Sequence, residues 1–106
     1  MERAAFLLKV RPDRLEEYRR QHESVWPEML EALRRNGWRN YSLFTTEDGH
    51  LFGYVEADES FQKSVEGMSK EDINLRWQEL MAPSFENLAG LPDQSMVQLE
   101  HIFVLE

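Results

Sequence analysis

Both ends of this chain are segments that carry apolar side chains on both faces of an extended strand. Near the start, Ala4 to Val10 is a short apolar run followed by Pro12, which is typical of a buried strand. Near the end, the stretch from Met96 to Leu105 has apolar residues on each face. A sheet built with such strands needs cover on both sides, because the second apolar face would otherwise lie in water.

Between these ends, the first long segment has a helical pattern. Pro12 suits the first turn of a helix, and apolar or aromatic residues then recur at three- and four-residue steps as far as Leu33. Pro27 lies inside this pattern, where it predicts a kink or the start of a second helical segment. Asn36-Gly37 is a typical helix end.

The remaining segments predict a hairpin, a second helical region and an irregular loop. They are strands over Trp38 to Thr46 and His50 to Ala57 joined at Glu47-Asp48-Gly49, helices over about Phe61 to Met68 and Lys70 to Met81, and a loop over Ala82 to Ser95. Asp58 or Ser60 can cap the helix that begins near Phe61.

The predicted order is β-α-β-β-α-β, the ferredoxin-like arrangement of the α+β class, with helices on one face of an antiparallel sheet. A length of 106 residues corresponds to one domain, residues 1–106. Helices on one side leave the other apolar face of the terminal strands open. A second copy of the chain is the simplest cover, so we expect a homodimer.

Charge and composition narrow the class of partner. The net charge of -8 is opposite to what phosphate contacts require, so we expect neither nucleic acid nor an anionic membrane as a partner. A neutral small molecule fits best. The chain has no cysteine, no signal-peptide pattern and no apolar run of roughly 20 residues, and we therefore expect a cytoplasmic protein.

Tyr18 and His22 are the first candidates for chemistry. They lie four residues apart, hence side by side, on the helical stripe that should face inward. A buried Tyr and His that satisfy each other would explain them. Alternatively, with Trp26 and Tyr41 they would line an aromatic pocket that contains one group titrating near neutral pH.

Arg76-Trp77 is the second candidate, because Arg76 could donate to hydroxyl groups in a cleft while Trp77 is either a core residue or a ligand platform.

The three histidines are far apart and lack a metal-binding spacing, so we expect no metal. A glycine-rich phosphate loop and a serine nucleophile elbow are also absent from the sequence.

With these residues identified, the chain resembles the L-rhamnose mutarotase family over essentially its whole length. The most specific part is Tyr18, then His22 and Trp26 at four-residue steps, followed by Pro27-Glu28. The other matching stretches are Phe6 to Val10, Pro12-Asp13, Asn40-Tyr41-Ser42, Leu51-Phe52-Gly53, Arg76-Trp77 and Pro92-Asp93-Gln94-Ser95.

The resemblance implies a dimeric α+β barrel that interconverts the α and β anomers of L-rhamnose. It implies that His22 is the proton donor and that Tyr18, Tyr41 and Trp77 bind sugar. From the chemistry of the reaction, we expect Tyr18 to orient His22 or to relay a proton. We also expect Arg76, Gln78, Trp26 and Asp93 at the sugar. Ring opening needs only proton transfers, so no cofactor is expected.

Two departures concern the exact sugar. Gln78 stands where the family commonly has a second Trp, and Leu91 stands where the family commonly has Asn before Pro-Asp. Gln78 either lines the pocket, replacing an aromatic surface with an amide, or points to solvent. Two other functions remain open on this scaffold: a different cofactor-free enzyme, such as a monooxygenase, and a non-catalytic sugar-binding module.

Overall fold

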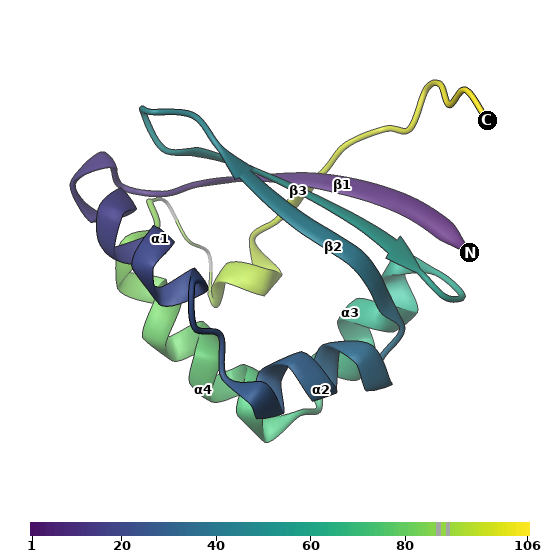
Figure 1. Ribbon diagram of the computed structural model, residues 1–106, viewed down its shortest axis with the longest axis horizontal. Helices are drawn as coiled ribbons and strands as arrows, with labels where there is room; N and C mark the ends of the chain where they lie inside the picture. Colours follow the sequence, from purple (N-terminus) through teal and green to yellow (C-terminus); the bar gives the residue numbers. More distant parts are fainter. Residues whose placement is uncertain (87, 89) are drawn as a thin grey trace.

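The sheet has four antiparallel strands and a single helical layer beside it (Figure 1). The computed structural model describes residues 1–86, 88 and 90–106. The strands are β1 (Glu2–Lys9), β2 (Trp38–Thr45), β3 (His50–Ala57) and β4 (Val97–Gln98), in the spatial order β2-β3-β1-β4. This order and the antiparallel pairing confirm the predicted α+β class with a ferredoxin-like arrangement.

The helices lie on one side of the sheet, below it in Figure 1. They are α1 (Leu15–His22), α2 (Pro27–Arg35), α3 (Phe61–Ser69) and α4 (Asp72–Met81), with 3₁₀ turns η1 (Pro12–Arg14), η2 (Ala82–Ser84) and η3 (Pro92–Gln94). None of these helices is long and apolar enough to cross a membrane, as far as the described residues extend.

Local sequence determines where the helices begin and end. Pro27 starts α2 after an extended Trp26, which confirms the predicted second segment and leaves His22 as the last residue of α1. The Ser60 hydroxyl accepts a hydrogen bond from the Lys63 backbone N–H at 3.1 Å, so the predicted cap of α3 is confirmed. Gly37, with φ of 80°, follows the end of α2 as expected.

A β-bulge in β2 reverses the side to which its residues point. Trp38 pairs with Ala57, whereas Ser42 pairs with Tyr54, so one extra residue lies between them. Asn40 lies at this irregularity with φ of 48°, and its side chain donates to Glu56 Oε1 at 3.1 Å. Tyr41 therefore packs against inner-face rings, whereas simple alternation from Trp38 would turn it outward.

The last strand is much shorter than the predicted Met96–Leu105. Val97 and Gln98 pair with β1, the Leu99 N–H donates to the Ala5 carbonyl at 2.8 Å, and residues 99–106 form no regular strand. The following segment rises on the side of the sheet away from the helices (Figure 1). Its apolar side chains Ile102 and Leu105 are 84% and 85% exposed. The edge of β1 continues to Glu2, beyond the residues that pair with β4, but the final segment leaves this edge after Leu99 and its apolar side chains stay uncovered.

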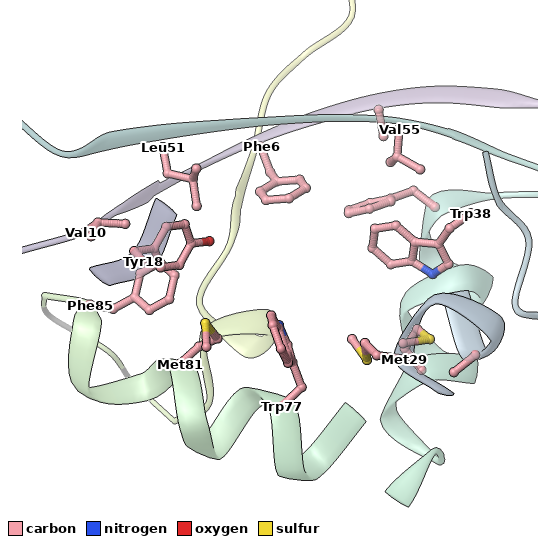
Figure 2. Close-up of a cluster of buried hydrophobic side chains, with 14 of the residues drawn as sticks. Phe6, Val10, Tyr18, Met29, Trp38, Leu51, Val55, Trp77, Met81 and Phe85 are labelled. Carbon is pink, nitrogen blue, oxygen red and sulfur yellow. The ribbon is translucent and has the colours of Figure 1, made fainter. Parts of the chain in front are cut away.

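The core lies between the sheet and the helical layer (Figure 2). Phe6, Leu51 and Val55 project from the sheet toward buried residues of the helices, which include Tyr18, Met29, Met68, Trp77 and Met81. The opposite face of the sheet exposes Leu7, Phe44 and Phe52.

We predict that the left-handed backbone at Asn40 is a structural requirement. Asn40→Ala should destabilise the protein by about 1–2 kcal/mol more than Asn40→Gly, because only glycine adopts this φ without a Cβ penalty. Both variants lose the bond to Glu56, so their difference isolates the backbone effect. Urea-induced unfolding measures it, and equal stability of the two variants would contradict this role of the bulge.

Candidate active site

A cavity of about 320 Å³ lies between the inner face of the sheet and the helical layer. Its lining is largely apolar, and the polar side chains in it are Tyr18, His22, Tyr41, Asn74, Gln78 and Asp93. Figure 2 shows Phe6 and Trp77 projecting toward the same space from opposite layers. A small apolar cavity with a few convergent polar groups is typical of a site for a small ligand.

His22 is held at the end of α1 by its own helix. Its Nδ1 lies 2.8 Å from the Tyr18 carbonyl oxygen. Because a carbonyl oxygen only accepts hydrogen bonds, Nδ1 carries the hydrogen, and Nε2 of the neutral ring keeps a free lone pair. The imidazole lies between the Tyr18 ring, at a centroid distance of 4.3 Å, and the Trp77 ring, at 5.5 Å.

The surroundings of His22 favour its neutral form. Burial lowers the pKa of the imidazole from its ordinary value of 6.5, and the hydrogen bond to the Tyr18 carbonyl opposes this effect only in part. At neutral pH the cavity therefore holds a proton acceptor that becomes a donor once it is protonated.

Two phenols share the cavity with His22. Burial, and secondly the neighbouring Tyr41, raise the pKa of the Tyr18 hydroxyl. Tyr41 is 37% exposed, yet desolvation of its phenol, followed by the charge of Asp93, raises its pKa as well. Both hydroxyls remain protonated at neutral pH and can donate hydrogen bonds to a ligand. Tyr18 orients His22 through its carbonyl and its ring.

One face of α4 forms the opposite wall. Asn74, Trp77, Gln78 and Met81 recur at steps of three and four residues, and all four line the cavity. Asn74 was not predicted from the sequence, although its spacing from Trp77 and Gln78 on one helix face could have indicated it. Asp93 reaches the same wall from η3.

Two of the predicted residues do not line the cavity. Arg76 is exposed, because neighbouring helix residues are turned by about 100° from each other and Trp77 takes the inward direction. The structure thus does not bring Arg76 together with the other predicted residues in this cavity, and its contact with a ligand stays a prediction. Trp26 is outside the lining too; its ring packs against Trp77 in a T-shaped contact at a centroid distance of 5.0 Å.

The cavity can therefore move protons on a neutral, hydroxyl-rich molecule. It contains a neutral imidazole with an open nitrogen, two phenols that donate, one carboxylate and an aromatic wall. In the part of the chain that the structure describes, no group of three or more His, Cys, Asp or Glu side chains could hold a metal ion.

Comparison with known proteins agrees with this chemistry. The family model for L-rhamnose mutarotase matches residues 3–105. The chain belongs to the L-rhamnose mutarotase family. An L-rhamnose mutarotase of Bacillus subtilis (strain 168) is 33% identical over 107 residues, which cover 100% of both chains. Another, from Listeria monocytogenes serotype 4b (strain F2365), is 36% identical and covers 94% of this chain and 92% of its own.

The solved structure of an L-rhamnose mutarotase from Formosa agariphila has the same fold. Its TM-score to this chain is 0.82 at 28% sequence identity, with 100% of each chain covered. The family that the sequence motifs predicted is thus confirmed, and so is the fold class.

We predict that the His22 imidazole titrates below pH 6.5, which NMR of its ring resonances measures, with His22→Gln to assign the signal. The unfolded chain then takes up this proton at a higher pH than the folded chain. The free energy of unfolding should therefore fall as the pH decreases through the interval between the two pKa values, and less so in His22→Gln. A midpoint at or above 6.5 would contradict the description of the site.

Proposed function

We propose that this chain is an isomerase that interconverts the α and β anomers of L-rhamnose, with His22 as the group that transfers the proton. The observation that carries the proposal is the position of the imidazole. Its Nδ1 is bound to the Tyr18 carbonyl, which leaves Nε2 as the open nitrogen of a ring that lines an aromatic cavity. Membership in the L-rhamnose mutarotase family supports the choice of sugar.

The reaction requires only proton transfers. Opening of the pyranose removes the proton from the anomeric hydroxyl, breaks the bond between C1 and the ring oxygen, and places a proton on that oxygen. The C1–C2 bond rotates and the ring closes on the other face of the aldehyde. The neutral Nε2 of His22 accepts a proton, and the resulting imidazolium returns one. A positioned acid–base group of this kind contributes about 10²–10⁴ in rate.

The other cavity residues would bind and orient the sugar. Protonated Tyr18 and Tyr41 donate to hydroxyl oxygens, and the Asp93 carboxylate accepts from a hydroxyl. Trp77 offers its ring to the apolar face of the pyranose, while Trp26 supports it. Burial of the 6-methyl group of a deoxy sugar adds about 0.8 kcal/mol.

We further propose that the protein is a homodimer that works in the cytoplasm. The apolar outer face of the sheet supports the dimer, together with the exposed side chains of the final segment. These residues are Leu7, Phe44, Phe52, Ile102, Phe103 and Leu105. A second copy of the same surface would remove both groups from water.

We predict that the protein accelerates anomer exchange of L-rhamnose, and that His22→Gln slows this exchange by about 100-fold or more. Tyr18→Phe should show a smaller loss, because the carbonyl that orients His22 remains. NMR saturation transfer between the anomeric protons measures the rates.

The matched control is His50→Gln, since His50 lies on the β2–β3 hairpin with its side chain 61% exposed, and it should exchange at the wild-type rate. Circular dichroism verifies that each variant is folded. Full activity in folded His22→Gln would refute the role of His22. Binding of L-rhamnose by the wild type without exchange would indicate a sugar-binding module.

We predict that light scattering at micromolar concentration gives about twice the chain mass of 12.6 kDa. Phe52→Glu should give monomers, because it places a charge on the outer face of the sheet. Leu80→Glu, on the exposed side of α4, is the control and should leave the mass unchanged. A wild-type monomer would contradict the proposed assembly.

A further inference from the structure

A closed ring of hydrogen bonds joins three polar side chains in the cavity wall. Asn74 Nδ2 donates to Asp93 Oδ2 at 2.9 Å, and Gln78 Nε2 donates to Asn74 Oδ1 at 3.1 Å. The ring closes where the Asp93 backbone N–H donates to Gln78 Oε1 at 3.1 Å. Asn74 also donates to the Met68 carbonyl at 3.1 Å, which ties the ring to the end of α3.

The partners determine the orientation of both amides. Asn74 Nδ2 faces two acceptors, the Asp93 carboxylate and the Met68 carbonyl, so the amino group must point that way. Gln78 faces one donor, the Asp93 N–H, and one acceptor, Asn74 Oδ1. A flip of either amide would bring donor against donor and acceptor against acceptor. The ring therefore has one satisfied arrangement.

This arrangement holds Asp93 at two points. Gln78 binds its backbone, and Asn74 binds one carboxylate oxygen. Two attachments fix the direction of the side chain as well as its position, and both come from the inward face of α4. Asn74 is only 2% exposed, so the group that orients the carboxylate is itself packed in place.

The second oxygen of Asp93 is available to a ligand. No hydrogen bond to Asp93 Oδ1 is found within residues 1–86, 88 and 90–106, and Asp93 lines the cavity. Tyr18 and Tyr41 line the same cavity as Asp93, and the charge of Asp93 contributes to the raised pKa of the Tyr41 phenol. A carboxylate with one oxygen bound and one open is a directional acceptor for a hydroxyl group.

We propose that Asn74 and Gln78 are positioning residues that aim Asp93 Oδ1 at one hydroxyl of the bound pyranose, and so select sugars that carry that hydroxyl. The inference rests on the proposed function. It also explains the position of Gln78, which lines the cavity but acts through Asp93, since its amide is engaged with Asn74 and Asp93.

A double-mutant cycle tests this inference. Gln78→Met keeps the length of the side chain and removes both hydrogen bonds, and it is made in the wild type and in Asp93→Asn. Calorimetry measures the Kd of L-rhamnose. We expect Gln78→Met to weaken binding several-fold in the wild type and by less than twofold in Asp93→Asn, because the two residues act as one unit. The value of kcat should change less than Kd, since the hydroxyl is held in ground and transition states alike.

Single-deoxy analogues of L-rhamnose identify the hydroxyl. One analogue should bind wild type and Gln78→Met with the same Kd, because it lacks the group that Asp93 accepts. The matched control is Gln62→Met on α3, where an exposed glutamine is hydrogen-bonded to Glu66 at 3.3 Å. This variant should leave the Kd of L-rhamnose unchanged both in the wild type and in Asp93→Asn. Because Gln78 is at the half-exposed edge of α4, the variant should fold, which circular dichroism verifies.

An equal loss in both backgrounds would overturn the inference, as would an unchanged Kd in the wild type or the same loss for every deoxy analogue. Wild-type protein that binds L-rhamnose without exchanging its anomers would refute the proposed function. The double-mutant cycle would then still decide whether Gln78 acts on sugar binding through Asp93. Wild-type protein that does not bind L-rhamnose would refute both.

Discussion

The hydrogen bond from His22 Nδ1 to the Tyr18 carbonyl oxygen is the interaction on which the site depends. It selects the tautomer, leaves Nε2 open and keeps the imidazole between two aromatic rings. It forms at the end of α1, where His22 is the last residue, the chain turns at Glu23-Ser24, and α2 begins separately at Pro27. A continuous helix through this region would place the same side chains in a different relation to the sheet.

Two independent structural features, a β-bulge and the residue spacing on one helix face, place the other cavity side chains around that imidazole. The bulge at Asn40 turns Tyr41 inward from the sheet, and the three- and four-residue spacing on α4 presents Trp77 and Gln78 from the opposite side. Desolvation then acts on His22 and on the two tyrosines: it lowers the pKa of the imidazole and raises the pKa of both phenols, so the neutral forms are favoured. The result is a site that accepts and donates protons without holding a fixed positive charge.

Periodicity predicted the residues whose position follows from their own element. Tyr18 and His22 were found by helical spacing, and Pro27 by its effect on a helix. The differences have physical causes: Arg76 is next to Trp77 in sequence and therefore lies outside the lining of the cavity, and the final segment leaves the edge of β1 after Leu99. The spacing of Asn74 from Trp77 and Gln78 could have indicated its direction, but its partner Asp93 is 19 residues away, in η3, and no local pattern predicts that contact. Homodimer, localisation and the roles of site residues stay predictions.

The central claim is that a pyranose lies in this cavity with its ring oxygen at His22. The most direct measurement is a crystal structure with 1,5-anhydro-L-rhamnitol, which keeps the ring oxygen and cannot open because it lacks the anomeric hydroxyl. In crystals kept at a pH low enough to protonate His22, the account predicts that Nε2–H donates to the ring oxygen at about 2.6–3.2 Å, with Asp93 Oδ1 on one of the remaining hydroxyls. A sugar bound elsewhere, or one in this cavity with its ring oxygen turned away from His22, would contradict it.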